Sequence, residues 1–443
     1  MIDILVQPGA WRRVVPVAVG ILELAFAPFG AAAQQAEPPA TVTLEQATAL
    51  AFQHNPQVVQ AAGTVSTSRA AERTAFGAYL PSLSVNAGTS LAGSNQFGSQ
   101  VGSISTGTSD SYSAGLSAAW DVYDPGRGAE RTQAKAQTQA AQADVVAQRA
   151  GVSLSVEQSF YAVLRAEDLI GVAQSRIQRA QEGVDAAQKR LTVGSATRSD
   201  VLRAQLELNT AQSALLEAQT QRDAARLALG RLVGADGPVG AQRAGDVSPK
   251  PLAMTDEQLI ASLVSQAPAI QAAQAASRAA EAGTAAARSQ YLPSLRLTTG
   301  YNWANQDPAF SDSRGSWSLG LGISYPVFNG FQREETSVRA QAQQVTAEAQ
   351  LADAARQVRS QAGSALGQLH LSEEKIRLAE QALQTSREDL RVQQERYRLG
   401  ASTILDLLSS QGAVVEAENN LVAARYDYQL ARAQLEALAG REL

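Results

Sequence analysis

The most regular hydrophobic pattern in the chain begins just after Asp200 and has the spacing of one helix face. Side chains recur there in steps of three and four residues, and eight of the nine positions are apolar: Val201, Ala204, Leu208, Ala211, Leu215, Ala218, Arg222, Ala225 and Leu229. This sustained spacing predicts a long helix that packs on neighbouring helices as in a coiled coil. Because many of the positions are alanine, the helices can approach closely.

A second long segment, Arg127 to about Leu191, contains no proline and is rich in Ala, Gln and Arg. If it is helical throughout, it extends on the order of 100 Å at about 1.5 Å per residue. That length exceeds what a globular domain requires.

Four further segments alternate between apolar and small polar residues, which is the pattern of a strand with two different faces. They predict strands at about 82–91, 111–123, 294–303 and 316–328. Each has the length of a tilted transmembrane strand, and Trp and Tyr gather towards the ends. The intervening segments, Ala92–Asp110 and Ala304–Ser316, are rich in Gly, Ser and Asn and predict loops. Strands with one face on lipid are favoured; a soluble antiparallel sheet packed on a helix is the alternative.

The chain contains an internal duplication. YLPSL occurs at Tyr79–Leu83 and again at Tyr291–Leu295, an offset of 212 residues. Farther along, Gly194 matches Gly400 at an offset of 206, so the first copy holds six additional residues between these landmarks. Repeats of this length indicate duplicated domains rather than a short solenoid unit.

The expected organisation therefore has four parts. These are a signal peptide at 1–33, a first repeat at 34–230, a connector rich in Gly and Pro at 231–254, and a second repeat at 255–443. Arg12 and Arg13 precede an apolar run, and Ala31–Ala33 follows it, as in a secretory signal with a small-residue cleavage site; a disordered leader is the alternative. The helical hairpins are expected to turn at about 191–199 and 397–405.

Composition excludes several classes of function. The chain has 443 residues, a formal net charge of −5, no Cys and two His. The charge argues against a general nucleic-acid binder, and the missing Cys excludes disulfides, cysteine zinc sites and thiol catalysis. No P-loop, dinucleotide fingerprint or HExxH is present, and His54 and His370 are isolated. We therefore expect no enzyme, no cofactor and no metal centre.

The strand number predicts an oligomer. Four strands form two hairpins with open edges, and in hydrocarbon each unpaired backbone group costs several kcal/mol. Two copies would give eight strands, a barrel filled by its own side chains, whereas three copies give twelve and leave room for water. A trimer is thus the smallest ring that conducts.

Four sequence features together resemble the TolC family of outer-membrane efflux and secretion ducts. They are TLEQATALAFQHNPQV at 43–58, the two YLPSL junctions, YPVFNG at 325–330, and the paired turns LTVGSATRSDVL and YRLGASTILDLL. The resemblance covers nearly the whole mature chain. It implies a mainly α fold with a small β part: a TolC-like tandem repeat with long coiled-coil helical hairpins and four transmembrane strands per protomer. Three protomers form a twelve-stranded β-barrel and a periplasmic α-barrel.

The resemblance also implies a location and partners. The chain is expected in the outer membrane of a Gram-negative bacterium, in contact with lipid and extending into the periplasm. It would act as a homotrimer with a periplasmic adaptor protein and an inner-membrane pump of the resistance-nodulation (RND), ABC or major-facilitator (MFS) type. It would conduct substrates passively to the exterior through an iris-like periplasmic gate, in efflux or type I secretion.

Residues at the two hairpin turns are matched to the family's gate. The resemblance assigns the gate or constriction to Asp406, Ser409, Asp200, Tyr397 and Ser402, and adaptor contact to Leu191, Gly194, Leu399 and Gly400. Relatives often have a second acidic ring where this chain has Ser409, and some have an arginine where it has Ser402. Arg198 is a candidate substitute for that arginine.

Simpler interpretations of these residues stay open. Asp200 and Asp406 also fit solvated first-turn carboxylates favoured by the helix dipole, and the glycines also fit residues that only make the turn. The alternative for the whole chain is a soluble periplasmic coiled-coil scaffold. The alternating segments distinguish the two functions, because a duct requires their apolar faces to touch lipid.

Overall fold

The computed structural model describes residues 41–97, 104–243, 245, 249, 254–305 and 314–443. Every described residue belongs to one compact unit, Pro38–Leu443. The predicted signal peptide at 1–33 lies outside the described residues.

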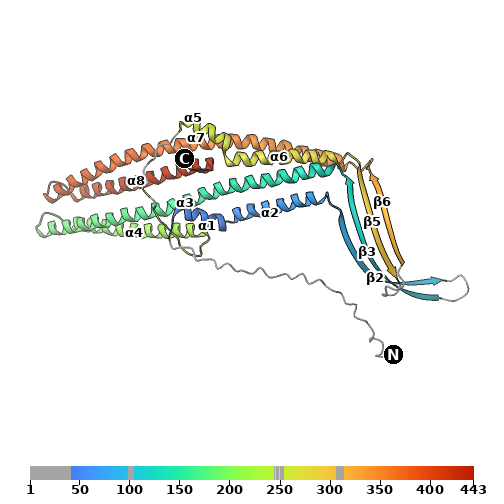
Figure 1. Ribbon diagram of the computed structural model, residues 1–443. Coiled ribbons are helices and arrows are strands. Elements are labelled where there is room, and N and C mark those ends of the chain that lie inside the picture. The colour runs from blue at the N-terminus through green and yellow to red at the C-terminus, as the bar shows by residue number, and fades with distance from the viewer. Residues whose placement is uncertain (1–40, 98–103, 244, 246–248, 250–253, 306–313) are drawn as a thin grey trace, which may run out of the picture. The chain divides into compact units, whose positions relative to one another are not determined.

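The two repeats contain matching elements in the same order (Figure 1). The first repeat holds α1 (Leu44–His54), α2 (Pro56–Gly77), β2 (Ser82–Phe97), β3 (Ile104–Tyr123), α3 (Gly126–Thr192) and α4 (Arg198–Val233). The second holds α5 (Asp256–Gln266), α6 (Pro268–Ser289), β5 (Ser294–Asn305), β6 (Arg314–Ser324), α7 (Gln332–Arg398) and α8 (Ile404–Ala439).

The matching helices have equal lengths. They have 11, 22, 67 and 36 residues in both repeats. The offset between the repeats is 212 at the starts of β2 and β5 and 206 at the starts of α3 and α7. The six additional residues of the first repeat therefore lie between the start of β2 and the start of α3.

Long helices pack in antiparallel pairs. Helix α3 packs on α4 and α7 on α8, while α8 also packs on α3 and joins the two hairpins. The helix face predicted to be buried in α4 is confirmed. Five of its nine positions are buried and the other four are half-buried; the buried ones are Ala204, Leu208, Ala211, Ala218 and Leu229. The core is thus a set of thin apolar seams along the hairpins.

The four long strands form one antiparallel sheet in the order β2-β3-β5-β6. Val85 pairs with Leu116, Leu116 with Tyr301, and Tyr301 with Trp317, so one apolar row crosses all four strands. Because side chains alternate along a strand, the neighbouring rows of Ser, Asn and Gly lie on the opposite face. The sheet has one apolar and one polar face.

Two predicted boundaries of the first strand hairpin are corrected by the structure. The pairing of β2 with β3 continues to Phe97 and Ile104, inside the segment predicted as the loop Ala92–Asp110. The small Gly, Ser and Thr residues that suggested a loop also fit a ladder, where their backbone groups pair regularly.

The last predicted strand, 316–328, is wrong at both ends. Strand β6 begins at Arg314 and stops at Ser324, two residues before Pro326. Proline has no N–H to donate to the ladder, so the alternation of Tyr325 and Val327 continues outside the sheet.

The segment between the repeats is shorter than predicted and is tied to the helices. Helix α4 runs to Val233, three residues into the predicted connector, and Gly234 ends it with a φ of 78°. A short parallel pair of β1 (Thr41–Val42) and β4 (Gly240–Ala241) follows. Arg243 donates to Asp168 on α3 and to the hydroxyl of Tyr426 on α8, which itself donates to Asp168 at 2.8 Å. The connector thereby joins the two hairpins.

The described residues contain neither a membrane-spanning helix nor a metal-binding cluster. None of the helices there has both the length and the apolar character needed to cross a bilayer. No group of three or more His, Asp or Glu residues in the same part of the chain is arranged to hold a metal ion.

Glu157 on α3 gives a testable pH dependence of stability. Burial raises the pKa of its carboxyl to about 7. A hydrogen bond from Ser153 lowers this pKa, but the effect of burial is larger. The unfolded chain ionises this carboxyl near pH 4.5, so folding stability should fall as the pH rises from about 4.5 past 7. Glu157→Gln should remove this loss and stabilise the protein at pH 8 by up to about 3 kcal/mol, at about 1.4 kcal/mol per pKa unit.

Thermal unfolding in detergent at pH 5 and pH 8 measures the effect. The charge-matched control is Glu217→Gln on the exposed surface of α4. An equal pH response of the wild type and Glu157→Gln would contradict the prediction.

Candidate functional site

The candidate site lies at the two turns that close the helical hairpins, at the end of the helices opposite the strands (Figure 1). The turns occupy 193–197 between α3 and α4, and 399–403 between α7 and α8. Gly194 and Gly400 have φ values of 76° and 81°, the left-handed conformation that glycine adopts without strain. Both glycines therefore make the turn, as the sequence predicted.

A capping box begins the helix that follows each turn. The hydroxyl of Thr197 accepts from Asp200 N at 3.2 Å, and the Asp200 carboxylate accepts from Thr197 N at 2.8 Å. Thr403 and Asp406 repeat this arrangement at 3.2 and 2.9 Å. The hydrogen bonds from the threonine N–H groups hold the pKa of both carboxyls below its ordinary value. Each helix start thus carries a fixed negative charge at neutral pH.

An arginine braces each turn from the preceding helix. Arg190 Nη2 donates to the Ser195 carbonyl at 2.9 Å, and Arg396 Nη2 donates to the Ala401 carbonyl at 3.3 Å. The two arginines are repeat equivalents at the offset of 206 residues. Local folding of the two turns is therefore nearly the same.

In the described part of the chain, Arg190 also forms a hydrogen bond with the other hairpin, and Arg396 does not. Its Nη1 donates to the carbonyl of Tyr397 at 2.5 Å, and its guanidinium lies 4.4 Å from the centroid of the Tyr397 ring. A Cβ at Gly400 would lie 3.7 Å from Nη2 of Arg190. Arg190 thus joins the end of α3 to the end of α7.

The Tyr397 side chain is buried, with 3% of its surface exposed. Its hydroxyl has no hydrogen-bond partner among the residues that the structure describes, and burial raises its pKa. The Asp200 carboxylate is bonded to Thr197. Tyr397 and Asp200 therefore form no hydrogen bond with each other within this protomer, although the family resemblance implies a polar link between them.

The other predicted gate residues are spread over the second turn. Ser402 is half-buried and its hydroxyl lies 3.5 Å from the Gln393 carbonyl, while Asp406 and Ser409 are exposed. Arg198, the candidate substitute for a gate arginine, is exposed at the first position of α4.

The predicted adaptor-contact residues lie at the outer surface of the turns. Gly194, Leu399 and Gly400 are exposed, and Leu191 is half-buried. Val193 was missed by sequence reasoning, yet it is as exposed as Leu399, each at 76%. The offset of 206 residues, which pairs these two positions, is the signal that could have found it.

Polar contacts also join the hairpins farther from the turns. Arg179 on α3 forms an ion pair with Glu418 on α8 at 2.8 Å, and Gln411 donates to the Arg179 carbonyl at 3.2 Å. Arg387 on α7 reaches the same Glu418 at 3.2 Å. Both side chains of the first pair are largely buried, so this contact fixes how α8 sits on α3.

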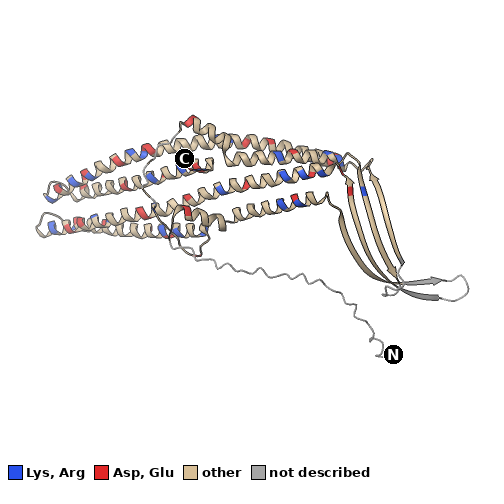
Figure 2. Cartoon of the chain, viewed as in Figure 1, with Lys and Arg blue, Asp and Glu red and all other residues tan. Residues whose placement is uncertain are grey.

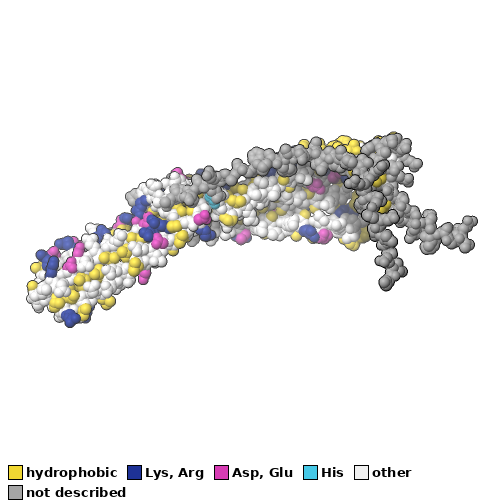
Figure 3. All heavy atoms as spheres, turned by 90° about the horizontal axis from the view of Figure 1, so that it is seen from below, with side chains coloured by type: hydrophobic (Ala, Val, Ile, Leu, Met, Phe, Trp, Pro, Cys, Tyr) yellow, Lys and Arg dark blue, Asp and Glu magenta, His cyan; other side chains and the backbone are white. Residues whose placement is uncertain are grey.

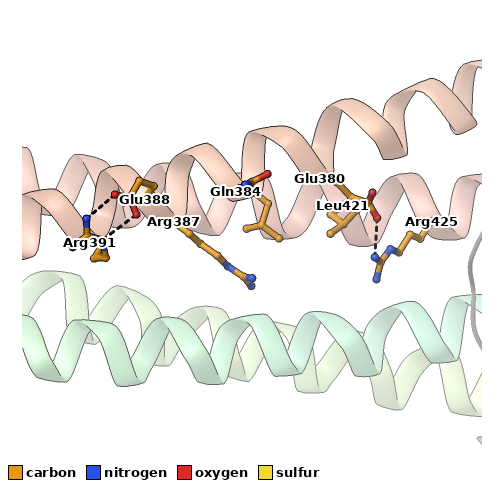
Figure 4. Close-up of a pocket in the computed structure, with 8 residues that line it drawn as sticks. Glu380, Gln384, Arg387, Glu388, Arg391, Leu421 and Arg425 are labelled. Atoms are coloured by element: carbon orange, nitrogen blue, oxygen red, sulfur yellow. Dashed lines mark hydrogen bonds and ion pairs between the residues drawn. The ribbon is translucent and has the colours of Figure 1, made fainter.

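An open groove of about 890 Å³ runs along α7 and α8 beside this contact (Figure 4). It is lined by Glu380, Leu383, Gln384, Arg387, Glu388, Arg391, Leu421 and Arg425. Arg391 pairs with Glu388 and Arg425 with Glu380, at 2.7 and 3.1 Å. Because each of its arginines has a carboxylate partner, the groove carries little unbalanced charge.

Charges are distributed unevenly between the helices and the sheet (Figure 2). Both signs are interspersed along the helices, whereas the strands carry few charges. Asp121 and Arg296 are register partners on neighbouring strands near the helices, and they form an ion pair at 3.3 Å. The sheet is thus nearly neutral over its described length.

Comparison with known proteins places the chain among outer-membrane channels. A family model described as "Outer membrane efflux protein" matches residues 48–235 and 259–441, one segment in each repeat. The chain is 24% identical over 396 residues to "Outer membrane protein TolC" of Vibrio cholerae, covering 88% of this chain and 89% of that protein.

Other relatives are matched over a smaller share. The chain is 28% identical to "Protein CyaE" of Bordetella pertussis over 68% of this chain and 64% of that protein. It is 27% identical to "Cation efflux system protein CusC" of Escherichia coli K12 over 54% of this chain and 53% of that protein. The chain thus spans between half and two thirds of the length of these two relatives.

Solved structures share the fold. The chain superimposes on a crystal structure of CusC with a TM-score of 0.77 and 21% identity, covering 92% of this chain and 96% of that one. For VceC of Vibrio cholerae the TM-score is 0.73 with 21% identity, covering 90% and 96%.

Proposed function

The chain belongs to the outer membrane efflux protein family, and we propose that it is the channel-tunnel of a tripartite efflux or type I secretion system. It resides in the outer membrane of a Gram-negative bacterium and extends into the periplasm. In this role it conducts substrates passively from a periplasmic adaptor and an inner-membrane pump of the RND, ABC or MFS type to the exterior. It performs no chemistry on them.

The observation that carries the proposal is the two-faced sheet. Apolar side chains on one face are strongly exposed in the protomer, among them Val85 at 79% and Leu319 at 65%. The opposite face is polar: Ser84 and Ser117 share a hydrogen bond of 2.8 Å, and Gly115 lies beside the amide of Asn86. Such a sheet suits lipid on one side and a water-filled lumen on the other.

Open sheet edges support a ring of several copies. Strands β2 and β6 are the edge strands of the described sheet. An unpaired edge in lipid is costly, and rotation symmetry allows β6 of one copy to pair with β2 of the next. Three copies supply twelve strands, enough to enclose water.

The helices give a second, independent reason to expect that several copies of the chain assemble. In α8, the face that holds Gln411 and Tyr426 packs on α3 and leaves these side chains 5% and 1% exposed. The matching face of α4, which holds Gln205 and Thr220, is exposed. Its large apolar residues are Leu202, Leu206, Leu216 and Leu227. Figure 3 views the helices from the side of α4 and shows apolar side chains among polar ones.

We infer that α7 of a second copy covers this α4 face. Helix α7 is the repeat equivalent of α3, so the contact between hairpins of two copies repeats the contact of α3 with α8 inside one copy. Three copies would then form a closed ring of six similar hairpin contacts, which agrees with the homotrimer proposed from the strand number.

We propose that Asp406 lies at a constriction of the duct. In a trimer, three fixed carboxylates at the starts of the α8 helices would concentrate negative potential where the hairpins converge. The remaining gate residues of the proposal are Ser409, Asp200, Tyr397 and Ser402. The exposed turn residues Leu399, Gly400 and Gly194, with the half-buried Leu191, are proposed to meet the adaptor.

Asp406→Asn should weaken the block of single-channel current by divalent cations on the order of tenfold. Asparagine keeps an acceptor for the capping box while removing the charge, so α8 should still begin at the same residue. Block constants measured in planar bilayers test this, with Asp353→Asn on the distant part of α7 as the control. An unchanged block constant would reject Asp406 as the constriction carboxylate.

Membrane association and conductance test the proposed function itself. The mature protein should be extracted from cell envelopes only by detergent, and the purified protein should form water-filled channels in planar bilayers. Release by osmotic shock, with no channel activity, would instead indicate a soluble periplasmic scaffold.

A further inference from the structure

We propose that Arg190 is the latch that holds the two hairpin turns of this chain together, and that it acts on the ring and backbone carbonyl of Tyr397 rather than on the tyrosine hydroxyl. The inference rests on the proposed function, because separation of the turns opens a pathway only in a duct. The residue that holds the closed state is then one of α3 that lies outside the proposed gate set, whereas its partner Tyr397 belongs to that set.

The guanidinium of Arg190 makes three contacts from one side chain. It donates to the carbonyl of Ser195 in its own turn, donates to the carbonyl of Tyr397 in the other hairpin, and lies over the Tyr397 ring. Hydrogen bonds from a charged donor and a cation over an aromatic face both gain strength where water is partly excluded. Arg190 thus connects the first turn to the end of α7.

The internal duplication supplies a direct comparison. Arg396 occupies the equivalent position in the second repeat and braces its own turn in the same way, through the Ala401 carbonyl. The residue that corresponds to Tyr397 in the first repeat is Leu191, which has neither an aromatic face nor a hydroxyl. Among the described residues, the contact of Arg190 with Tyr397 therefore has no counterpart between Arg396 and Leu191.

The Tyr397 hydroxyl opposes closure. It is buried without a hydrogen-bond partner in the described part of the chain, as is Oε1 of Gln393 one turn earlier on the same helix. A buried polar group without a partner destabilises the arrangement that buries it, and exposure to water relieves the cost. Removing the hydroxyl alone should therefore favour the closed turns, whereas removing the ring should open them.

Single-channel recording of purified trimers separates these roles. Arg190→Ala should raise the open population about tenfold, since it removes a charged hydrogen bond and a cation–π contact. Arg396→Ala, the matched control, should leave the open population near that of the wild type. Tyr397→Phe should conduct no more than the wild type, and Tyr397→Ala should resemble Arg190→Ala.

A distance measurement provides a readout independent of conductance. The chain has no cysteine, so spin labels attached through Val193→Cys and Leu399→Cys are specific to the two turns. In detergent-solubilised trimers, Arg190→Ala should lengthen or broaden the distribution of label distances, and Arg396→Ala should not. Arg190→Lys, which keeps the charge but loses the planar fork, should fall between the wild type and Arg190→Ala.

Two results would overturn the latch. One is equal conductance and equal label distances for Arg190→Ala and Arg396→Ala. The other is opening by Tyr397→Phe to the extent of Arg190→Ala, because the hydroxyl would then hold the closed state. Both require a wild-type protein that conducts, so they are distinguishable from failure of the proposed function, in which the wild type forms no channel.

Discussion

Leu319→Arg should prevent stable insertion of the protein into the outer membrane, whereas Ser318→Arg should be inserted and assembled. The two residues are neighbours in the middle of β6 and point to opposite faces of the sheet, and Leu319 belongs to the exposed apolar face. An arginine on the lipid face costs about 2–4 kcal/mol near the bilayer midplane, and a trimer carries three of them, so the total is roughly 6–12 kcal/mol.

Fractionation of cell envelopes tests this prediction by measuring how much of each variant reaches the outer membrane. The Leu319→Arg protein should be depleted from the outer-membrane fraction or degraded, while Ser318→Arg should be recovered there and should alter conductance instead. Equal insertion of the two variants would mean that the apolar face does not contact lipid, and the assignment of the sheet would then be wrong.

Leu216→Asp should convert the trimer into monomers without unfolding the hairpins. Leu216 is 64% exposed on α4, on the face whose α8 counterpart packs against α3. If a second copy covers this face, each of three interfaces must bury a carboxylate without a partner, at a cost on the order of 2 kcal/mol or more. The ring closes only when all three contacts form, so the loss is cooperative.

Light scattering in detergent gives the number of copies. Gln221→Asp is the matched control, because it introduces the same charge on the exposed opposite flank of α4. We expect Gln221→Asp to remain trimeric and both variants to keep the helical circular dichroism of the wild type. A trimeric Leu216→Asp protein would exclude the proposed contact between α4 and α7.

The helices and turns were largely predictable, because their signals are local. Apolar residues spaced by three and four positions identify the buried face of α4 directly. The glycines at 194 and 400 mark turns that need a positive φ. Strand ends were less predictable. Small polar residues in 92–110 suit both a loop and a ladder, and only the partner strand decides between them.

The contact between Arg190 and Tyr397 could not be predicted for a different reason. The two residues are 207 positions apart, and both lie in helices whose patterns specify which face is buried but not which helix covers it. Asp200 and Tyr397 were selected by resemblance, whereas the structure shows Asp200 bonded within its own capping box. Pairing between distant helices depends on the packing of the whole hairpin set.

Equal helix lengths in the two repeats restrict how this protein can change during evolution. Inserting one residue into α3 alone would rotate the part of the helix beyond the insertion by about 100° and shift it by about 1.5 Å relative to α7. The apolar faces of the two hairpins would then no longer meet. A taller or shorter tunnel therefore requires the same insertion or deletion in both copies. The strand hairpins and their connections to the long helices are free of this restriction, and there the two copies already differ by six residues.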